Sequence, residues 1–184
     1  MNIPNAVTLF RIAMVPVAIW LIINNQPALA FWVFLLAGIS DGVDGFIAKR
    51  FGQETTLGRY LDPMADKLLL VSLVIALGIL EQIPSWLVLC VVFRDGIMLA
   101  AILLAWMLDN PVEIDPIAIS KLNTALQIIL IAIVLADWAF GLGLETLRLI
   151  LGWFTGLTTV VSAVIYLRTW IRHMTHGTDR QPMA

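Results

Sequence analysis

Six long runs of apolar residues fill almost the whole chain and leave it few possible folds. They cover roughly residues 5–24, 28–50, 57–80, 85–108, 117–139 and 146–171. A helix needs about 20 apolar residues to cross the roughly 30 Å hydrocarbon core of a bilayer, and each run reaches this length. The runs are continuous and lack the strict alternation of membrane-barrel strands. We therefore predict one all-α integral membrane domain over residues 1–184, with six transmembrane helices.

The composition excludes several other classes of protein. Apolar residues make up 60% of the chain and charged residues 13%, against about 45–50% and about 25% in soluble domains. The net charge of −2 provides no basic field that would attract nucleic acid. A single cysteine, Cys90, excludes an intrachain disulfide and a cysteine-rich zinc site. We expect neither a soluble enzyme nor a nucleic-acid-binding or disordered protein.

The distribution of basic residues predicts the orientation of the helices, because cytoplasmic loops carry an excess of lysine and arginine. Basic residues flank the second turn and lie at or beyond the end of the last run: Lys49, Arg50, Arg59, Arg168, Arg172 and Arg180. The turns 24–27 and 81–84 contain none, and Arg148 is the exception to the rule. We expect both termini to be cytoplasmic. No basic region precedes the first run, so we expect no cleaved signal peptide and place the chain in a bacterial inner membrane.

Four aspartates interrupt the second and third runs at the same depth. Asp41 and Asp44 lie three residues apart, and Asp62 and Asp66 lie four apart, so each pair shares a helix face. A short turn joins the two helices as antiparallel neighbours. An aspartate at the centre of a span costs about 2.5–3.5 kcal/mol and less toward the interface, so bound divalent cations are expected to offset the charge. All-oxygen ligation favours Mg²⁺, Mn²⁺ or Ca²⁺, and two ions about 4 Å apart suit phosphoryl chemistry.

The spacing of these residues resembles the pattern of the CDP-alcohol phosphotransferase family, D-x2-D-G-x2-A-R-x8-G-x3-D-x3-D. The matching residues are Asp41, Asp44, Gly45, Ala48, Gly58, Asp62 and Asp66. Lys49 stands where the family has arginine; it keeps the positive charge but loses the bidentate fork of a guanidinium. The small residues leave the carboxylate face open to a bulky phosphate.

The resemblance extends along most of the chain. Residues 3–11, with Asn5 and Arg11, resemble the family's first helix, which helps to hold the cytidine. Arg94-Asp95 and the stretch 119–127 are most similar to the cardiolipin synthases of this family, whereas 61–67 is also similar to the phosphatidylglycerophosphate synthases.

The resemblance implies a six-helix homodimer in the membrane with cytoplasmic active sites and two divalent ions, Mg²⁺ or Mn²⁺, in each. The implied metal ligands are Asp41, Asp44, Asp62 and Asp66, and Asp66 is also the implied general base. The implied binding site for CDP-diacylglycerol consists of Asn5, Asp41, Gly45, Ala48, Lys49, Gly58 and Asp62. The implied reaction transfers the phosphatidyl group of CDP-diacylglycerol to an alcohol and releases CMP.

An acceptor with a phosphate group needs a cation to bind it, and three residues are candidates: Arg94, Lys121 and Arg59. Arg94 and Lys121 interrupt apolar runs, which is costly enough to suggest a function. We expect phosphatidylglycerol as the acceptor, with glycerol 3-phosphate as the alternative. Two other classes compete with an enzyme, a divalent-cation channel or carrier and an assembly scaffold. Aspartates confined to the cytoplasmic end argue against a channel or carrier, and a scaffold leaves the four aspartates unexplained.

Overall fold

The computed structural model describes the backbone of residues 3–51, 56–107 and 118–176 and the side chains of 9–40, 67–100 and 119–170. Within these ranges the chain forms six α-helices and no strand. The helices are α1 (Ile3–Ile23), α2 (Pro27–Phe51), α3 (Thr56–Ile79), α4 (Ser85–Met107), α5 (Ala118–Phe140) and α6 (Glu145–His176). The predicted boundaries are confirmed to within about two residues, except that α6 continues five residues past 171.

The turn after α1 shows how polar residues end these apolar helices. Asn25 adopts a left-handed conformation, with φ of 57°, which asparagine tolerates better than most residues. The backbone N–H of Asn25 donates to the carbonyl of Ile22 at 3.1 Å, and that of Gln26 donates to Leu21 at 2.9 Å. These two bonds form a Schellman motif, which satisfies the last carbonyls of a helix. Glu81, with φ of 57°, ends α3 with the same pattern.

The turn between α5 and α6 explains the basic residue that broke the charge rule. Gly141 and Gly143 have positive φ there, 62° and 68°, which glycine adopts without steric cost. Asp137 accepts a bond from the backbone N–H of Leu144 at 2.9 Å and pairs with Nη1 of Arg148, also at 2.9 Å. Nη2 of Arg148 donates to the carbonyl of Gln82 at 2.6 Å. The charge of Arg148 is therefore matched inside the fold, and the side chain ties two turns together.

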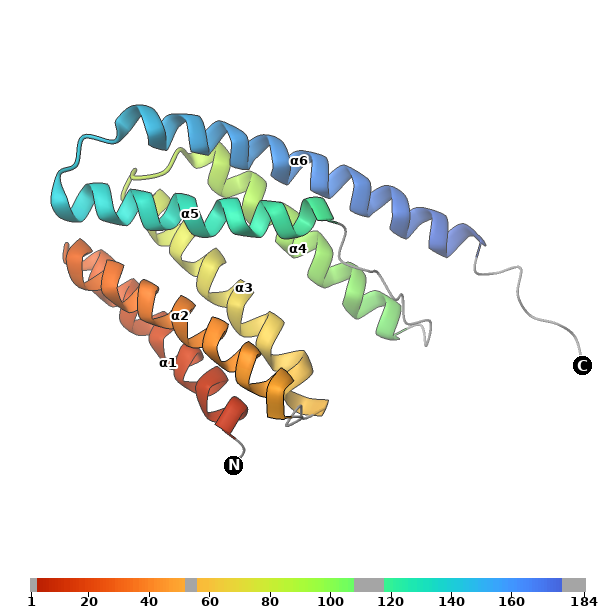
Figure 1. The fold of residues 1–184 in the computed structure, drawn as a ribbon. Helices are drawn as coiled ribbons and strands as arrows, with labels where there is room; N and C mark the ends of the chain where they lie inside the picture. The colour runs from red at the N-terminus through yellow and green to blue at the C-terminus, as the bar shows by residue number, and fades with distance from the viewer. Residues whose placement is uncertain (1–2, 52–55, 108–117, 177–184) are drawn as a thin grey trace, which may run out of the picture.

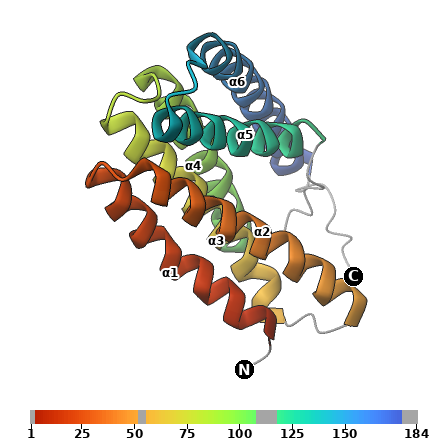
Figure 2. The same cartoon turned by 60° about the vertical axis from the view of Figure 1, so that its left-hand side comes forward.

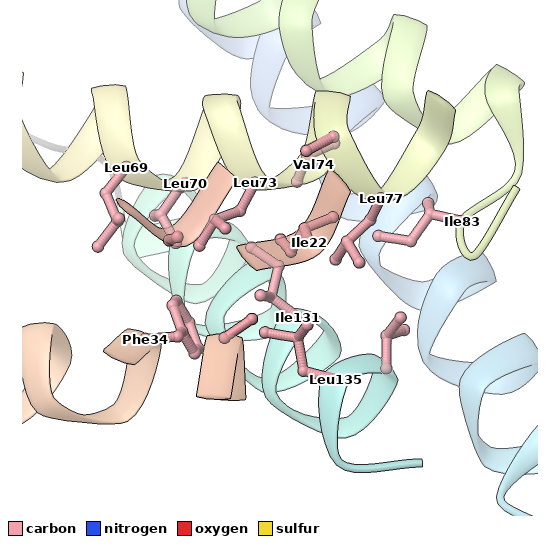
Figure 3. Packing of buried hydrophobic residues seen from close by; sticks show 14 of the residues in the cluster. Ile22, Phe34, Leu69, Leu70, Leu73, Val74, Leu77, Ile83, Ile131 and Leu135 are labelled. Carbon is pink, nitrogen blue, oxygen red and sulfur yellow. The ribbon is translucent and has the colours of Figure 1, made fainter. Parts of the chain in front are cut away.

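Packing joins the helices into one bundle. α1 packs on α2 and α3, α2 on α5, α5 on α6, and α4 on α3 and α6. The core lies among α1, α2, α3 and α5, where Ile22, Phe34, Leu73, Ile131 and Leu135 converge (Figure 3).

Successive helices run in opposite directions. In Figures 1 and 2 the three described turns, after α1, α3 and α5, lie at one end of the bundle. The N-terminus of α1, the end of α2 and the start of α3 lie at the opposite end. This arrangement places the aspartate-bearing ends of α2 and α3 at one end of the bundle.

Large apolar side chains cover much of the outer surface of the helices. On α6 alone, Leu149, Trp153 and Leu157 are 63, 62 and 63% exposed. Apolar surfaces of this extent mark a membrane or an interaction partner. Among the described residues, two segments, Ile119–Phe140 and Glu145–Trp170, are long and apolar enough to cross a membrane by length and composition. The helices α1, α2 and α3 hold shorter apolar stretches within those residues.

A pair of leucines on α3 tests the packing. Leu77 is completely buried, whereas Leu68 on the same helix is 52% exposed. We expect Leu77→Ala to lower the free energy of unfolding by about 2–5 kcal/mol because it leaves a cavity. Leu68→Ala should change it by about 0.5 kcal/mol or less. Denaturant titration of both variants in detergent micelles measures the difference, and equal losses would contradict the core described above.

Candidate active site

The four aspartates lie on helical backbone, as their spacing requires. Asp41 and Asp44 are in the last part of α2, and Asp62 and Asp66 are in the first part of α3. Each pair therefore does share a helix face. Their side chains fall outside the described ones, so the convergence of the four carboxylates remains a prediction.

The other motif residues share this status. The backbones of Asn5, Gly45, Ala48, Lys49, Gly58 and Arg59 lie in α1, α2 and α3, and their side chains are outside the described set. Among the side chains that the structure does describe, no three His, Cys, Asp or Glu residues gather in a group that could hold a metal. That finding does not reach the aspartate motif.

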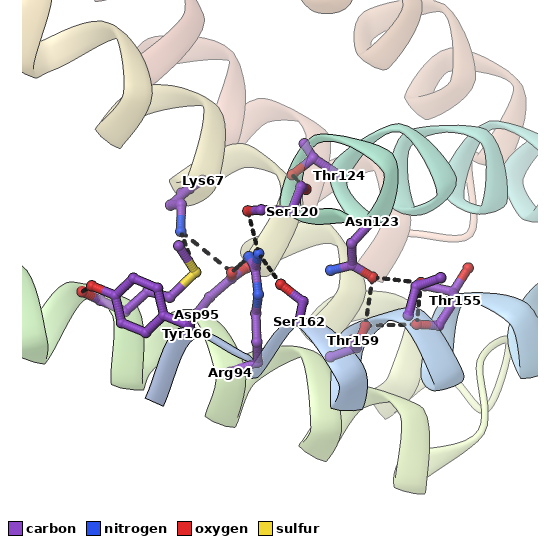
Figure 4. Close-up of polar contacts among 12 residues, drawn as sticks. Lys67, Arg94, Asp95, Ser120, Asn123, Thr124, Thr155, Thr159, Ser162 and Tyr166 are labelled. Carbon is purple, nitrogen blue, oxygen red and sulfur yellow. Dashed lines mark hydrogen bonds and ion pairs between the residues drawn. The ribbon is translucent and has the colours of Figure 1, made fainter. Parts of the chain in front are cut away.

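A cluster of three charged side chains begins at the residue that follows the aspartate motif on α3 (Figure 4). It consists of Lys67 from α3 and Arg94 and Asp95 from α4. Asp95 Oδ1 contacts both cations, Lys67 Nζ at 3.4 Å and Arg94 Nη1 more closely. The Lys67 side chain is 27% exposed and that of Arg94 is 2% exposed. Asp95, whose role the sequence left open, therefore bridges α3 and α4.

Arg94 also anchors the two following helices. Its Nη2 donates to Ser120 Oγ on α5 at 2.6 Å and to Ser162 Oγ on α6 at 3.0 Å. The guanidinium therefore connects α4, α5 and α6 at one level of the bundle. Of the three predicted acceptor cations, Arg94 is buried and held by protein groups, Lys121 is exposed on α5, and the side chain of Arg59 is outside the described set.

A second polar group lies next to this cluster, between α5 and α6 (Figure 4). Asn123 Oδ1 accepts bonds from Thr158 Oγ1 at 2.9 Å and Thr159 Oγ1 at 2.8 Å. Asn123, from the stretch 119–127, therefore forms hydrogen bonds between α5 and α6. The partners of Asn123 on α6 were not predicted from the sequence. A signal was present, because polar residues recur at helical spacing on one face of α6: Thr155, Thr159, Ser162 and Tyr166. All four are buried.

A cavity of about 300 Å³ lies between α1, α2, α3 and α5. Arg11 and Thr124 are the polar side chains on its wall; the other lining residues, such as Phe34, Leu70 and Ile128, are apolar. Gly38 faces open space there, with no atom within 4 Å of the position that a Cβ would take. Since Gly38 precedes Asp41 by one helical turn, the cavity adjoins the aspartate region toward the middle of the bundle.

Comparisons with known proteins identify relatives that match most of the chain. Residues 1–174 match the family model for CDP-alcohol phosphatidyltransferase. The chain is 36% identical to the human (Homo sapiens) cardiolipin synthase (CMP-forming) over 181 residues, covering 90% of this chain and 60% of that protein.

Two further relatives carry a different name. The chloroplastic CDP-diacylglycerol–glycerol-3-phosphate 3-phosphatidyltransferase 1 of Oryza sativa subsp. japonica is 34% identical, over 90% of this chain and 56% of that protein. The corresponding Haemophilus influenzae protein is 28% identical, over 91% of this chain and 92% of that protein. The chain spans about three fifths of the length of the human and rice proteins.

The charge pairing at Arg94 can be tested by substitution. Asp95→Asn leaves buried Arg94 without the one carboxylate that contacts it among the described side chains. Breaking a buried pair costs about 3–5 kcal/mol, and we expect a loss of unfolding free energy in this range. The double variant Arg94→Met/Asp95→Asn should recover part of the loss, because the fully buried guanidinium is removed and only the partly exposed Lys67 loses its carboxylate. Chemical denaturation of both proteins in detergent provides the comparison; a double variant less stable than Asp95→Asn would refute the pairing.

Proposed function

Since the chain belongs to the CDP-alcohol phosphatidyltransferase family, we propose that it transfers the phosphatidyl group of CDP-diacylglycerol to an acceptor alcohol and releases CMP. The family match over residues 1–174 carries this proposal. The names of the relatives support it, since one is a CMP-forming synthase and another names CDP-diacylglycerol as the donor.

The acceptor in this proposal is phosphatidylglycerol, which makes the chain a cardiolipin synthase. The human and Rattus norvegicus relatives with that name, each 36% identical, support the choice. The resemblance of the stretch 119–127 to the cardiolipin synthases of the family also supports it. This stretch supplies Ser120 and Asn123 to the polar groups between helices. Glycerol 3-phosphate is the second candidate, because relatives from rice and Haemophilus influenzae are named for it.

The proposed setting is a single domain over residues 1–184 with six membrane spans and cytoplasmic termini. Six antiparallel helices with exposed apolar faces support this arrangement. Arg148, the basic residue at the other end, is paired with Asp137 and so does not oppose the charge rule. A homodimer in a bacterial inner membrane completes the proposal. Relatives from Streptomyces coelicolor and Haemophilus influenzae are consistent with that location.

The donor set at the ends of α2 and α3 fits hard divalent cations, because it consists of carboxylate oxygens from Asp41, Asp44, Asp62 and Asp66. The resemblance of the motif to that of the family implies divalent metals, and we propose two ions, Mg²⁺ or Mn²⁺, in each site. When bound, such ions stabilise negative charge on the transferring phosphoryl group and on CMP.

The remaining chemistry belongs to side chains of the protein. Asp66 accepts the proton of the acceptor hydroxyl as a general base. The donor nucleotide and diphosphate lie against the proposed binding residues Asn5, Asp41, Gly45, Ala48, Lys49, Gly58 and Asp62. Lys49 supplies positive charge, and the absence of side chains at Gly45 and Gly58 leaves room for the diphosphate.

The phosphate of the acceptor needs a cation of its own, since it would otherwise repel the donor diphosphate. Arg94, Lys121 and Arg59 are the proposed residues. Of the two with described side chains, Lys121 is exposed, whereas Arg94 is enclosed by α4, α5 and α6.

The acceptor is tested by supplying each candidate to the purified protein with CDP-diacylglycerol. We expect a product with the mass of cardiolipin from phosphatidylglycerol, with stoichiometric CMP. Chelation with EDTA should abolish CMP release, and added Mg²⁺ or Mn²⁺ should restore it. Mass spectrometry identifies the product. Formation of phosphatidylglycerophosphate from glycerol 3-phosphate, with no product from phosphatidylglycerol, would instead support the second candidate. CMP release unaffected by chelation would exclude the metal.

The general base is tested by Asp66→Asn, which keeps the size of the side chain but removes the basic carboxylate. Turnover should fall by at least about 100-fold, while CDP-diacylglycerol still protects the protein against thermal unfolding. Glu145→Gln, at an exposed position on α6, is the matched control and should retain full activity. Turnover of Asp66→Asn near the wild-type rate would remove Asp66 from the mechanism.

A further inference from the structure

The cluster of Lys67, Arg94 and Asp95 carries more positive than negative charge. Two cations share one carboxylate, so the formal charge of the three side chains is +1. The other described buried ion pair, Arg148 with Asp137, is balanced one to one. An excess charge in a low-dielectric bundle is costly unless an anion lies close to it. The cluster is therefore a candidate anion site.

Neighbouring residues on the same helix do not supply that anion. The positions one helical turn from Lys67 hold Pro63, Met64, Leu70 and Val71, none of which is acidic. Asp66 is the adjacent residue, and adjacent residues on a helix do not face each other. Among the described side chains, Asp95 is the only carboxylate in ion-pair contact with either cation.

Lys67 is the member of the cluster that can reach an outside ligand. Both terminal nitrogens of Arg94 are engaged, Nη1 by Asp95 and Nη2 by two serines, and the side chain is 2% exposed. The Lys67 side chain is 27% exposed, and its Nζ lies 3.4 Å from Asp95 and 3.9 Å from the sulfur of Met98. An ammonium group has three donors, so these long contacts leave Lys67 able to bind an additional anion.

Lys67 also lies at the same height in the bundle as the proposed base, Asp66. It follows the proposed base, Asp66, on α3, at a rise of about 1.5 Å along the helix axis. A ligand whose phosphate meets Lys67 can present a nearby hydroxyl to the region of Asp66. Acceptor alcohols of the proposed reaction have this chemistry, because they carry a phosphate and a free hydroxyl on one glycerol unit.

We propose that Lys67 binds the phosphate of the acceptor alcohol and that Asp95 is a positioning residue that holds Lys67 through its carboxylate. This inference rests on the proposed function and replaces Arg94 with Lys67 among its acceptor cations, because both terminal nitrogens of Arg94 are already engaged. Arg94 orients Asp95 and fixes α4 against α5 and α6. The ligand chemistry is a phosphate on glycerol, whether the diester of phosphatidylglycerol or the monoester of glycerol 3-phosphate.

Initial rates with varied acceptor and varied CDP-diacylglycerol test the assignment. Lys67→Met should raise KM for the acceptor by about 10–100-fold, the range expected for loss of a charge-assisted hydrogen bond. The KM for CDP-diacylglycerol should stay within about twofold, because the donor diphosphate is held elsewhere. Lys67→Arg, which keeps the charge, should restore most of the acceptor affinity.

Two further variants separate this role from general effects of charge. Arg168→Met removes an exposed cation from α6 and should leave both KM values unchanged. Asp95→Asn should raise the acceptor KM by less than Lys67→Met, since Lys67 is released but still present. Equal increases in donor and acceptor KM for Lys67→Met, or a fall in kcat alone, would overturn the proposal. So would an equal effect of Arg168→Met.

A binding measurement distinguishes this inference from the proposed function. Asp66→Asn protein in nanodiscs is titrated with glycerol 3-phosphate, and separately with phosphatidylglycerol in the disc, with and without Lys67→Met. The acceptor whose binding depends on Lys67 identifies the source of the phosphate. If the wild type forms no product with either acceptor, the proposed function fails, yet Lys67-dependent binding still supports the site. Binding that is independent of Lys67 refutes the site even in an active enzyme.

Discussion

A buried guanidinium in an apolar bundle must be matched by charge and hydrogen bonds, and Arg94 meets this requirement with groups from three helices. Asp95 on α4 neutralises its charge, and the hydroxyl groups of Ser120 on α5 and Ser162 on α6 accept hydrogen bonds from it. Contacts of this one side chain therefore join α4, α5 and α6 at one level of the bundle. Asp95 also contacts Lys67, and this ion pair connects α4 to α3.

This connection links two parts of the molecule with different tasks. The aspartate motif lies on α2 and α3, whereas Arg94, Asp95 and the Asn123 group lie on α4, α5 and α6. Lys67 is both the neighbour of Asp66 in sequence and the contact of Asp95 in space. The proposed donor site and the proposed acceptor site therefore meet at Asp66 and Lys67 on α3, where a phosphoryl group would have to pass from one to the other.

Much of the helical architecture could be predicted from periodicity and turn chemistry. Asn25, Glu81 and Gly141 end or follow helices where the sequence placed turns. The end of α6 was missed, because polar residues such as Arg172 and His173 read as a tail although they continue the helix. The partners of Arg94 were also missed. A serine in an apolar run can bond to its own helix, so Ser162 gave no signal of an interhelical contact.

The amino-acid sequence alone determined the spacing of the four aspartates and most of the helix boundaries, because these depend on local hydrophobicity and on the 3.6-residue period. Tertiary structure alone decided which charges meet. Lys67 and Asp95 are 28 residues apart, and Arg94 and Ser162 are 68 apart. No local rule specifies such contacts, since they arise only when the packing of apolar faces brings α3, α4, α5 and α6 to one place.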